Sequence, residues 1–381
     1  MVWGSLLVAL FVASCTPQAQ PPRTEEIAFR SGSFELVGDL RLPGGIGPYP
    51  VVVFVHGDSP ADRTMYGLYL PIMERMLRAG YATFSWDNPG IGESTGMTDR
   101  QQIIQQQAQI VLDGIEVMKA RTDIDLQRIG LWGVSMAGYV MPRVLSRTAD
   151  VAFMICVSCA GMSGHDNKGY QITTYAMFCE DVPEENADQR TVLFADLDKA
   201  RTYETYEEYL HYREVLDAFV DISPSRQKLL QALSENGASG AVPEAAWQAN
   251  DPEIEGWWNP VEVLEQVRIP VLSIFGDRDM NGDPIQGAYA WEAALEQAGN
   301  RNFRVEILPG VDHFMVASES RCLNEQEGMF DQVLQKQGYG PMEESFMLFQ
   351  QEPGQHTPLS TWPYAPEYLD LIEEWLTNLL Q

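Results

Sequence analysis

The sequence predicts an α/β fold, in which a mostly parallel sheet of eight strands carries helices on both faces and an inserted helical cap. Three observations lead to this prediction. Short apolar runs alternate with helix-length amphipathic segments along most of the 381 residues, which is typical of parallel β-α-β units. The alternation stops over residues 162–256, where helical patterns interleave with acidic residues. Turns rich in Gly, Ser, Asp and His follow several of the apolar runs.

The individual elements follow from local patterns. Residues 27–42 alternate apolar and polar side chains around Arg30-Ser31-Gly32-Ser33, which predicts an antiparallel hairpin. Apolar runs predict six more strands, at residues 51–55, 81–86, 128–132, 151–157, 269–275 and 303–308. Helical periodicity predicts helices at residues 66–79, 101–119, 136–146 and 286–298, and a final one after Pro366. We therefore expect a core of residues 25–161 and 257–381, with residues 162–256 as the cap.

The N-terminal residues have the pattern of an export signal. Residues 5–12 form an apolar run that is too short to span a bilayer and ends in small residues. The segment Val12-Ala13-Ser14-Cys15 resembles the bacterial lipobox, in which the cysteine is lipidated. We expect residues 1–15 to be a signal peptide and the polar, proline-containing residues 16–24 to be a tether. The protein would then be exported and held at the bacterial envelope by a lipid on Cys15; an apolar N-terminus that stays attached is the alternative.

The charge of the chain limits its partners. The formal net charge is −29 and the isoelectric point is about 4.4, which disfavours phosphate backbones and anionic lipid surfaces. We therefore expect no nucleic-acid partner, and contact with a membrane only through the lipid anchor. A well-solvated surface accounts for the charge, and an acidic site for a cationic partner is the alternative. The oligomeric state does not follow from the sequence.

The cysteines do not indicate a disulfide scaffold. Without Cys15 there are four, at positions 156, 159, 179 and 322. Cys156 and Cys159 lie at the end of an apolar run that predicts a buried strand. Side chains three positions apart in a strand point to opposite faces, so we expect these two to be separate structural cysteines. A bridge between Cys179 and Cys322 is an open alternative.

The segment Trp132-Gly133-Val134-Ser135-Met136-Ala137-Gly138 is the sharpest chemical signal. It lies between a predicted strand and a predicted helix, so Ser135 would stand on a tight strand-to-helix turn that exposes its hydroxyl. The N–H of Met136 would lie at the helix N-terminus, where it can stabilise a developing oxyanion. The turn at Val55-His56-Gly57-Asp58 follows an earlier strand, and we expect the Asp58 N–H to be the second oxyanion donor, with its side chain pointing away.

A serine hydroxyl needs a base and an orienting carboxylate to act as a nucleophile. Of five histidines, only His313 follows a late core strand in a turn. Asp279 ends the turn Gly276-Asp277-Arg278-Asp279, after the preceding strand, and is the predicted acid. The competing carboxylates are Asp277, Asp283 and Asp312.

Several motifs together resemble the bacterial α/β-hydrolases related to acyl esterases and prolyl-oligopeptidase-type hydrolases. They are His56-Gly57-x-x-Pro60-x-Asp62-Arg63, Asp87-x-Pro89-Gly90-x-Gly92-x-Ser94, the Ser135 turn, Asn259-Pro260 before Ile269-Pro270-Val271-Leu272, Gly276-x-x-Asp279 and Pro309-Gly310-x-x-His313. The resemblance covers about residues 26–161 and 257–381. It implies the triad Ser135, Asp279 and His313 and a cap over the active site, and it does not identify the substrate.

The sequence thus predicts a carboxylesterase-like serine hydrolase that acts on a small-molecule ester or acyl substrate. No cofactor is expected, and no metal site, because there is no H-E-x-x-H motif and no Cys/His cluster with zinc spacing. Trp257 and Trp258, at the end of the cap, are candidates for the substrate pocket, although such aromatic residues are commonly core residues. A serine peptidase or acyl-peptide hydrolase is one alternative function, and a non-catalytic surface protein of the same fold is another.

Overall fold

The computed structural model describes residues 20–58, 61–99, 102–161, 259–319 and 363–380, and a few positions between them, namely 170, 205–207, 210–211 and 214. Outside the described residues lie the expected signal peptide, the lipidation site Cys15, Trp257 and Trp258, and the cysteines at 179 and 322.

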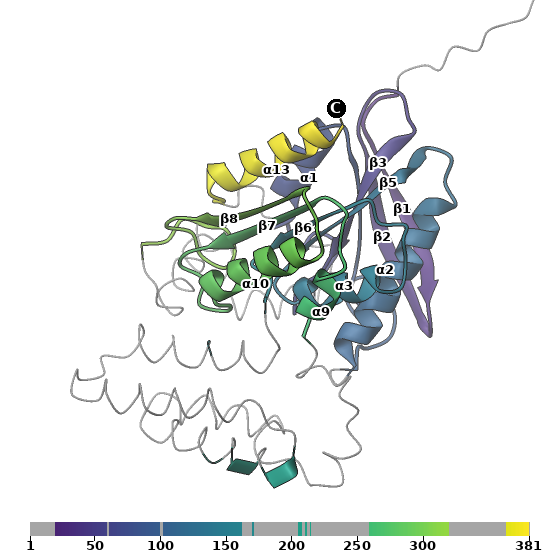
Figure 1. Ribbon diagram of the computed structural model, residues 1–381. Helices are drawn as coiled ribbons and strands as arrows, with labels where there is room; N and C mark the ends of the chain where they lie inside the picture. Colours follow the sequence, from purple (N-terminus) through teal and green to yellow (C-terminus); the bar gives the residue numbers. More distant parts are fainter. Residues whose placement is uncertain are drawn as a thin grey trace, which may run out of the picture.

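In the described part of the chain, a sheet of eight strands forms the centre (Figure 1), in the order β1-β2-β4-β3-β5-β6-β7-β8. The strands are β1 (Arg23–Ser31), β2 (Phe34–Leu42), β3 (Tyr49–Val55), β4 (Ala82–Trp86), β5 (Ile124–Val134), β6 (Phe153–Val157), β7 (Val271–Gly276) and β8 (Phe303–Leu308). Strand β2 pairs antiparallel with both β1 and β4, and every other pairing is parallel. The predicted α/β class with a mostly parallel sheet of eight strands is therefore confirmed, whereas the expected cap at residues 162–256 lies almost entirely outside the described residues.

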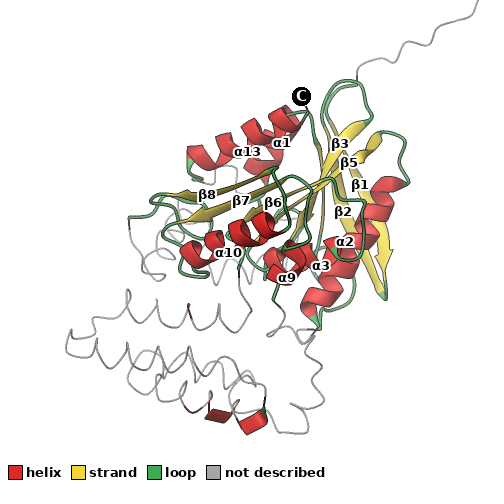
Figure 2. Cartoon of the chain, in the orientation of Figure 1, coloured by secondary structure: helices red, strands yellow, loops and turns green. Residues whose placement is uncertain are grey.

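Helices cover both faces of the sheet (Figure 2). One face carries α1 (Leu70–Arg78) and α13 (Pro366–Leu379), and the other carries α2 (Ile103–Lys119), α3 (Ala137–Leu145), α9 (Val261–Leu264) and α10 (Pro284–Gln297). Central strand β3 shows why the strands are continuously apolar. Val51, Val53 and Val55 enter the core beneath α2 and α3, whereas Val52 and Phe54 enter the core beneath α1 and α13.

Helix α1 is shorter than predicted. It begins at Leu70 rather than at residue 66, because Met65, Tyr66 and Gly67 have φ angles of 49°, 54° and 95°, and a right-handed helix cannot contain such residues. Its C-terminal end agrees with the prediction, since Gly80 has a φ of 89° and ends the helix in a left-handed conformation.

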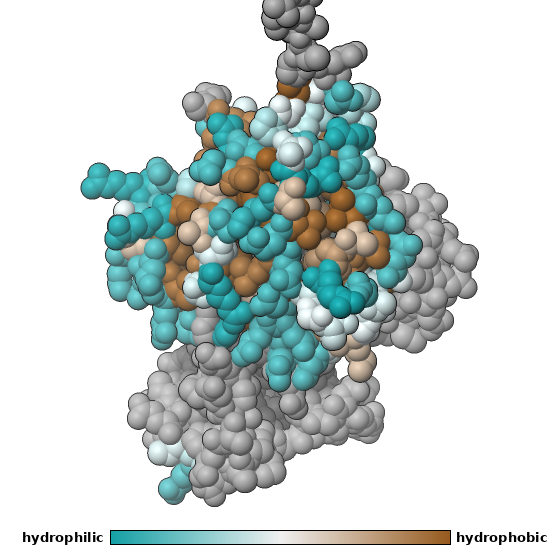
Figure 3. Space-filling model, turned by 90° about the vertical axis from the view of Figure 1, so that its right-hand side faces the viewer, coloured by the Kyte–Doolittle hydropathy of each residue, from teal (hydrophilic) through white to brown (hydrophobic). Residues whose placement is uncertain are grey.

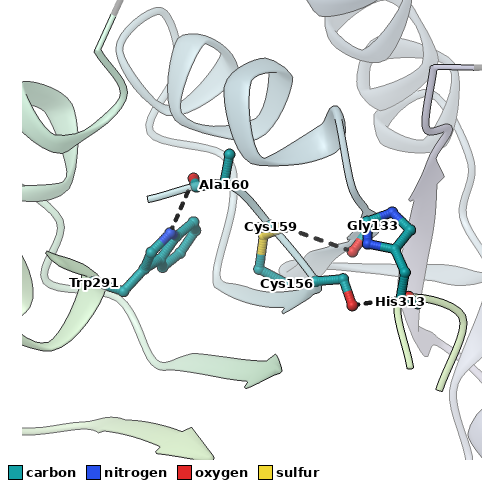
Figure 4. The surroundings of a disulfide bond; sticks show 7 residues. Gly133, Cys156, Cys159, Ala160, Trp291 and His313 are labelled. Carbon is teal, nitrogen blue, oxygen red and sulfur yellow. Dashed lines mark hydrogen bonds between the residues drawn. A yellow bond between two sulfur atoms is a disulfide. The ribbon is translucent and has the colours of Figure 1, made fainter. Parts of the chain in front are cut away.

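The expectation for Cys156 and Cys159 is wrong, because these residues form a disulfide with their Cα atoms 5.9 Å apart (Figure 4). The strand β6 ends at Val157, so the alternation of side chains ends there too. Ser158 then has a φ of 50°, and the chain turns back so that Cys159 approaches Cys156. The prediction failed because it applied the alternation of strand side chains to Cys159, which lies beyond the end of the strand.

The described part of the chain contains no helix of the length and apolar character needed to cross a bilayer. On the face of the molecule shown in Figure 3, hydrophilic residues separate the apolar ones into patches.

Candidate active site

Ser135 stands on the turn between β5 and α3. Its φ is 58°, an unfavourable conformation for a residue with a side chain, and its N–H donates to the carbonyl of Val157 at the end of neighbouring β6 (2.9 Å). Helix α3 begins two residues later, at Ala137. The turn is so tight that a Cβ on Gly133 would collide with the Cβ of Ala137. The structure therefore has the strained strand-to-helix turn that the sequence predicts for a nucleophile.

Both predicted oxyanion donors lie next to this turn. Met136 is the N-cap residue of α3, so its N–H is at the positive end of that helix. The loop after β3 passes close by, since a Cβ on Gly57 would lie 3.6 Å from the Cβ of Ser135. Asp58 follows Gly57 and is exposed.

His313 and Asp279 form a buried hydrogen-bonded pair. The Nδ1 of His313 lies 2.8 Å from the Oδ2 of Asp279, and the two residues are 5% and 2% exposed. The other oxygen of Asp279 accepts hydrogen bonds from the N–H groups of Asn281 (2.8 Å) and Gly282 (3.0 Å). A carboxylate only accepts, so Nδ1 carries the proton and Nε2 keeps its lone pair. The imidazole is thus held in the tautomer that can accept a proton.

Burial and charge act in opposite directions on the pKa of His313. Burial of the ring disfavours the charged form, but the attraction and hydrogen bond of Asp279 outweigh it, and Asp312 adds to that attraction. The net effect raises the pKa of His313 above its ordinary value of 6.5.

The carboxylates of the competing residues accept hydrogen bonds from backbone N–H groups and make no hydrogen bond to His313. Asp277 accepts from the N–H of Gly310 (2.6 Å). Asp283 caps the N-terminus of α10 through the N–H groups of residues 285 and 286. Asp312 accepts from the N–H groups of residues 314 and 316. Among these described aspartates, Asp279 alone makes a hydrogen bond to His313.

No hydrogen bond joins the side chains of Ser135 and His313, which both lie in the described part of the chain. Their backbones are nevertheless linked through the end of β6. Val157 accepts the N–H of Ser135, and the hydroxyl of the next residue, Ser158, donates to the carbonyl of His313 (2.8 Å). A small cavity beside the turn is lined by Val134, Val157 and His313, among other residues.

Three other motif residues, His56, Arg63 and Asp87, make contacts within the loops after β3 and β4. The His56 ring is buried, with Nε2 2.7 Å from the carbonyl of Trp86 and Nδ1 3.3 Å from the hydroxyl of Tyr69. Burial lowers its pKa. Arg63 joins the loops after β3 and β4 through an ion pair with the buried Asp87 (2.8 Å). These contacts fix the backbone that carries Gly57 and Asp58.

Two residues that contact His313 and Asp279 were missed in the sequence. Ser158 bonds the carbonyl of His313, and the hydroxyl of Tyr170 donates to the carbonyl of Asp279 (3.0 Å). Ser158 follows a strand, as Asp279 and His313 do, so the same signal could have found it. No sequence pattern indicates Tyr170. Within the described residues, no group of three or more His, Cys, Asp or Glu side chains is arranged to hold a metal ion.

Comparisons with known proteins identify a family and several similar proteins. A model of the "Alpha/beta hydrolase family" matches residues 52–321. A 20-hydroxy-prefusarin hydrolase of Gibberella moniliformis is 34% identical over 127 residues, which cover 32% of this chain and 27% of that protein. An esterase of Thermotoga maritima is 21% identical over 294 residues, covering 75% of this chain and 59% of that one.

A solved esterase structure from Pyrococcus furiosus aligns with 77% of this chain and 84% of its own, at 15% identity and a TM-score of 0.47. The matched part of the chain spans about a third or less of the length of the first curated relatives.

Proposed function

The chain belongs to the alpha/beta hydrolase family, and from that premise we propose that it is a serine hydrolase that cleaves carboxylic esters through an acyl-enzyme. The observation that supports this most is the buried hydrogen bond between His313 and Asp279 (2.8 Å). It leaves Nε2 of His313 unprotonated at the edge of the sheet from which Ser135 projects.

The proposed reaction has two halves. The hydroxyl oxygen of Ser135 attacks the ester carbonyl while Nε2 of His313 takes its proton. The N–H groups of Met136 and Asp58 stabilise the negative charge on the former carbonyl oxygen. Collapse of this intermediate releases the alcohol, which receives the proton from His313, and leaves an acyl group on Ser135. Water then attacks the acyl group with the same assistance, and the acid is released. No step calls for a cofactor.

The substrate class is proposed as a small-molecule ester or acyl compound, because the T. maritima relative is named an esterase. The segment between β6 and α9 enters and leaves at the edge of the sheet that carries Ser135, so we propose it as a cap. Replacing Trp257 and Trp258 by Ala should then change the ranking of ester chain lengths, because each methylene in a pocket is worth about 1 to 3 kcal/mol of discrimination. A uniform loss on all esters would mean that the two tryptophans are core residues.

Two further proposals concern partners and location. The charge of −29 argues against a nucleic-acid partner. Lipidation of Cys15 would tie the protein to the bacterial envelope, and mass spectrometry of the protein isolated from membranes would detect the lipid.

The function is tested with p-nitrophenyl esters of graded acyl length, assayed beside a series of aminoacyl-nitroanilides. We expect hydrolysis of the esters, stronger than that of the anilides, and labelling of Ser135 by a fluorophosphonate probe. The variant S135A should lose about 10⁴-fold or more in kcat and lose the label, with an unchanged melting temperature. A preference for the anilides would indicate that the protein is a peptidase rather than an esterase. If the folded wild-type protein is neither active nor labelled, the proposal that it is a serine hydrolase is refuted.

A further inference from the structure

Ser158 is a buried serine in an unfavourable conformation. Its φ is 50° and it is 3% exposed. Both of its donors are used. The N–H donates to the carbonyl of Ile274 on β7 (2.8 Å), and the hydroxyl donates to the carbonyl of His313 (2.8 Å), which lies 155 residues away in sequence. The hydroxyl thus joins the end of β6 directly to the backbone of the proposed base.

The disulfide encloses this serine. Cys156 is the penultimate residue of β6, and Cys159 follows Ser158, so the bridge closes a short ring that contains Ser158. Both sulfur-bearing residues are buried, at 0% and 2% exposure. Figure 4 shows Gly133 and His313 on one side of the bridge, and Ala160 with Trp291 on the other. A left-handed serine is uncommon without outside constraint, and the ring supplies one.

The same ring touches the turn of the nucleophile. A Cβ on Gly138, in the first turn of α3, would lie 2.7 Å from the Cβ of Cys159, so the start of this helix packs directly on the bridge. The Sγ of Cys159 lies 4.0 Å from the carbonyl of Gly133, two residues before Ser135. On the far side, the indole N–H of Trp291 donates to the carbonyl of Ala160 (3.3 Å) and fixes the exit of the chain.

We propose that Ser158 is a positioning residue for His313, and that the Cys156–Cys159 disulfide holds Ser158 in the conformation this requires. The inference rests on the proposed role of His313 as general base. Asp279 sets the tautomer and direction of the imidazole, whereas the Ser158 hydroxyl fixes the backbone from which the imidazole projects. The two contacts together determine where Nε2 meets the hydroxyl of Ser135.

The first experiment compares S158A and S158G with S273A. Ser273 is a matched control, because it is fully buried on adjacent β7 and its hydroxyl makes no hydrogen bond among the described residues. With p-nitrophenyl acetate, both variants of Ser158 should lose about tenfold or more in kcat with KM little changed, since small errors in the position of a base are costly. Their rate of fluorophosphonate labelling should fall equally, and the acidic limb of the pH profile should move to lower pH as the contact with Asp279 loosens.

The S158G variant distinguishes a role of the hydroxyl from an effect of backbone strain, because glycine adopts a φ of 50° without strain. Loss of activity in S158G as well as in S158A supports the proposal. Full activity in S158G refutes it, since the hydroxyl would then be dispensable. Values of kcat within twofold of S273A for both variants also refute it. If wild type is inactive and unlabelled, the proposed function itself fails; if S135A abolishes an activity that the Ser158 variants retain, only this inference fails.

The second experiment tests the bridge. Peptide mapping under non-reducing conditions should show the Cys156–Cys159 link in purified protein, and free thiols at both positions would refute its role. Removing both cysteines, as C156A/C159A, should lower kcat in the same way as S158A. Adding S158A to this double variant should cost little more, because groups that act through one contact are not additive. Fully additive losses would show that the bridge acts independently of Ser158.

Discussion

The change Asp279→Asn tests the proposed acid most directly. In the structure, Oδ1 of Asp279 accepts hydrogen bonds from the N–H groups of Asn281 and Gly282, and Oδ2 faces Nδ1 of His313. An asparagine has one oxygen and one NH₂ group for these two positions. With its oxygen toward the two N–H groups, the NH₂ group must donate to Nδ1. The imidazole then carries its proton on Nε2 and cannot accept one from Ser135.

The magnitude follows from the alternative orientation of the amide. Turning the oxygen toward His313 would leave the N–H groups of Asn281 and Gly282 facing an NH₂ group. The donor of Gly282 is buried, and an unsatisfied buried donor costs about 1 to 3 kcal/mol, whereas the donor of Asn281 is partly buried and adds less. The unproductive orientation is therefore preferred by about 1 to 3 kcal/mol or somewhat more. We expect kcat to fall by about 10⁴-fold, which is the size of effect that a wrong tautomer has in a serine triad. The two backbone hydrogen bonds survive, so the fold should too.

The assay is kcat for p-nitrophenyl acetate, together with the melting temperature by circular dichroism. Asp283→Asn is the matched control, because Asp283 caps α10 and asparagine is an equally good cap. It should keep activity within about twofold. A kcat for the Asp279 variant within tenfold of wild type would refute the assignment, and a larger loss for Asp312→Asn would identify the other carboxylate as the acid.

Three further predictions concern pH and packing. The base acts only when neutral, so the raised pKa of His313 should place the acidic limb of kcat/KM above the ordinary 6.5, measured from about pH 5 to 9. Burial raises the pKa of Asp312 from 3.8 to about 6, so the folded state holds this proton more tightly and stability falls as pH rises from about 4 through 6. Urea unfolding should show that the wild-type free energy of unfolding falls by up to about 3 kcal/mol over this pH range and that the Asp312→Asn variant lacks this fall. The variant should also shift the acidic limb of kcat/KM to lower pH. Gly133→Ala should lower stability by about 1 to 3 kcal/mol, because its Cβ collides with Ala137; calorimetry showing an unchanged melting temperature would contradict the tight turn.

Most of the secondary structure could be predicted because its causes are local. The hairpin at the start of the core needs only alternating side chains and Gly32, whose φ is 55°. The parallel strands need only continuous apolar runs, because both of their faces are buried. The prediction failed where backbone conformation changes without a clear sequence signal. Such changes occur at Met65 and Tyr66, which shorten α1, and at Ser158, which turns Cys159 back to Cys156.

The fold class could be inferred from the amino-acid sequence alone, and so could the positions of Ser135, Asp279 and His313, each just after a strand. Parallel strands end at the same edge of a sheet, so order along the chain was enough to bring these residues to one edge. The choice between the nearby aspartates needed the three-dimensional structure, because the aspartate that faces the histidine depends on which backbone N–H groups each turn offers to its carboxylate. The contacts of Ser158 and of Tyr170 were likewise decided there, since each joins segments more than 100 residues apart.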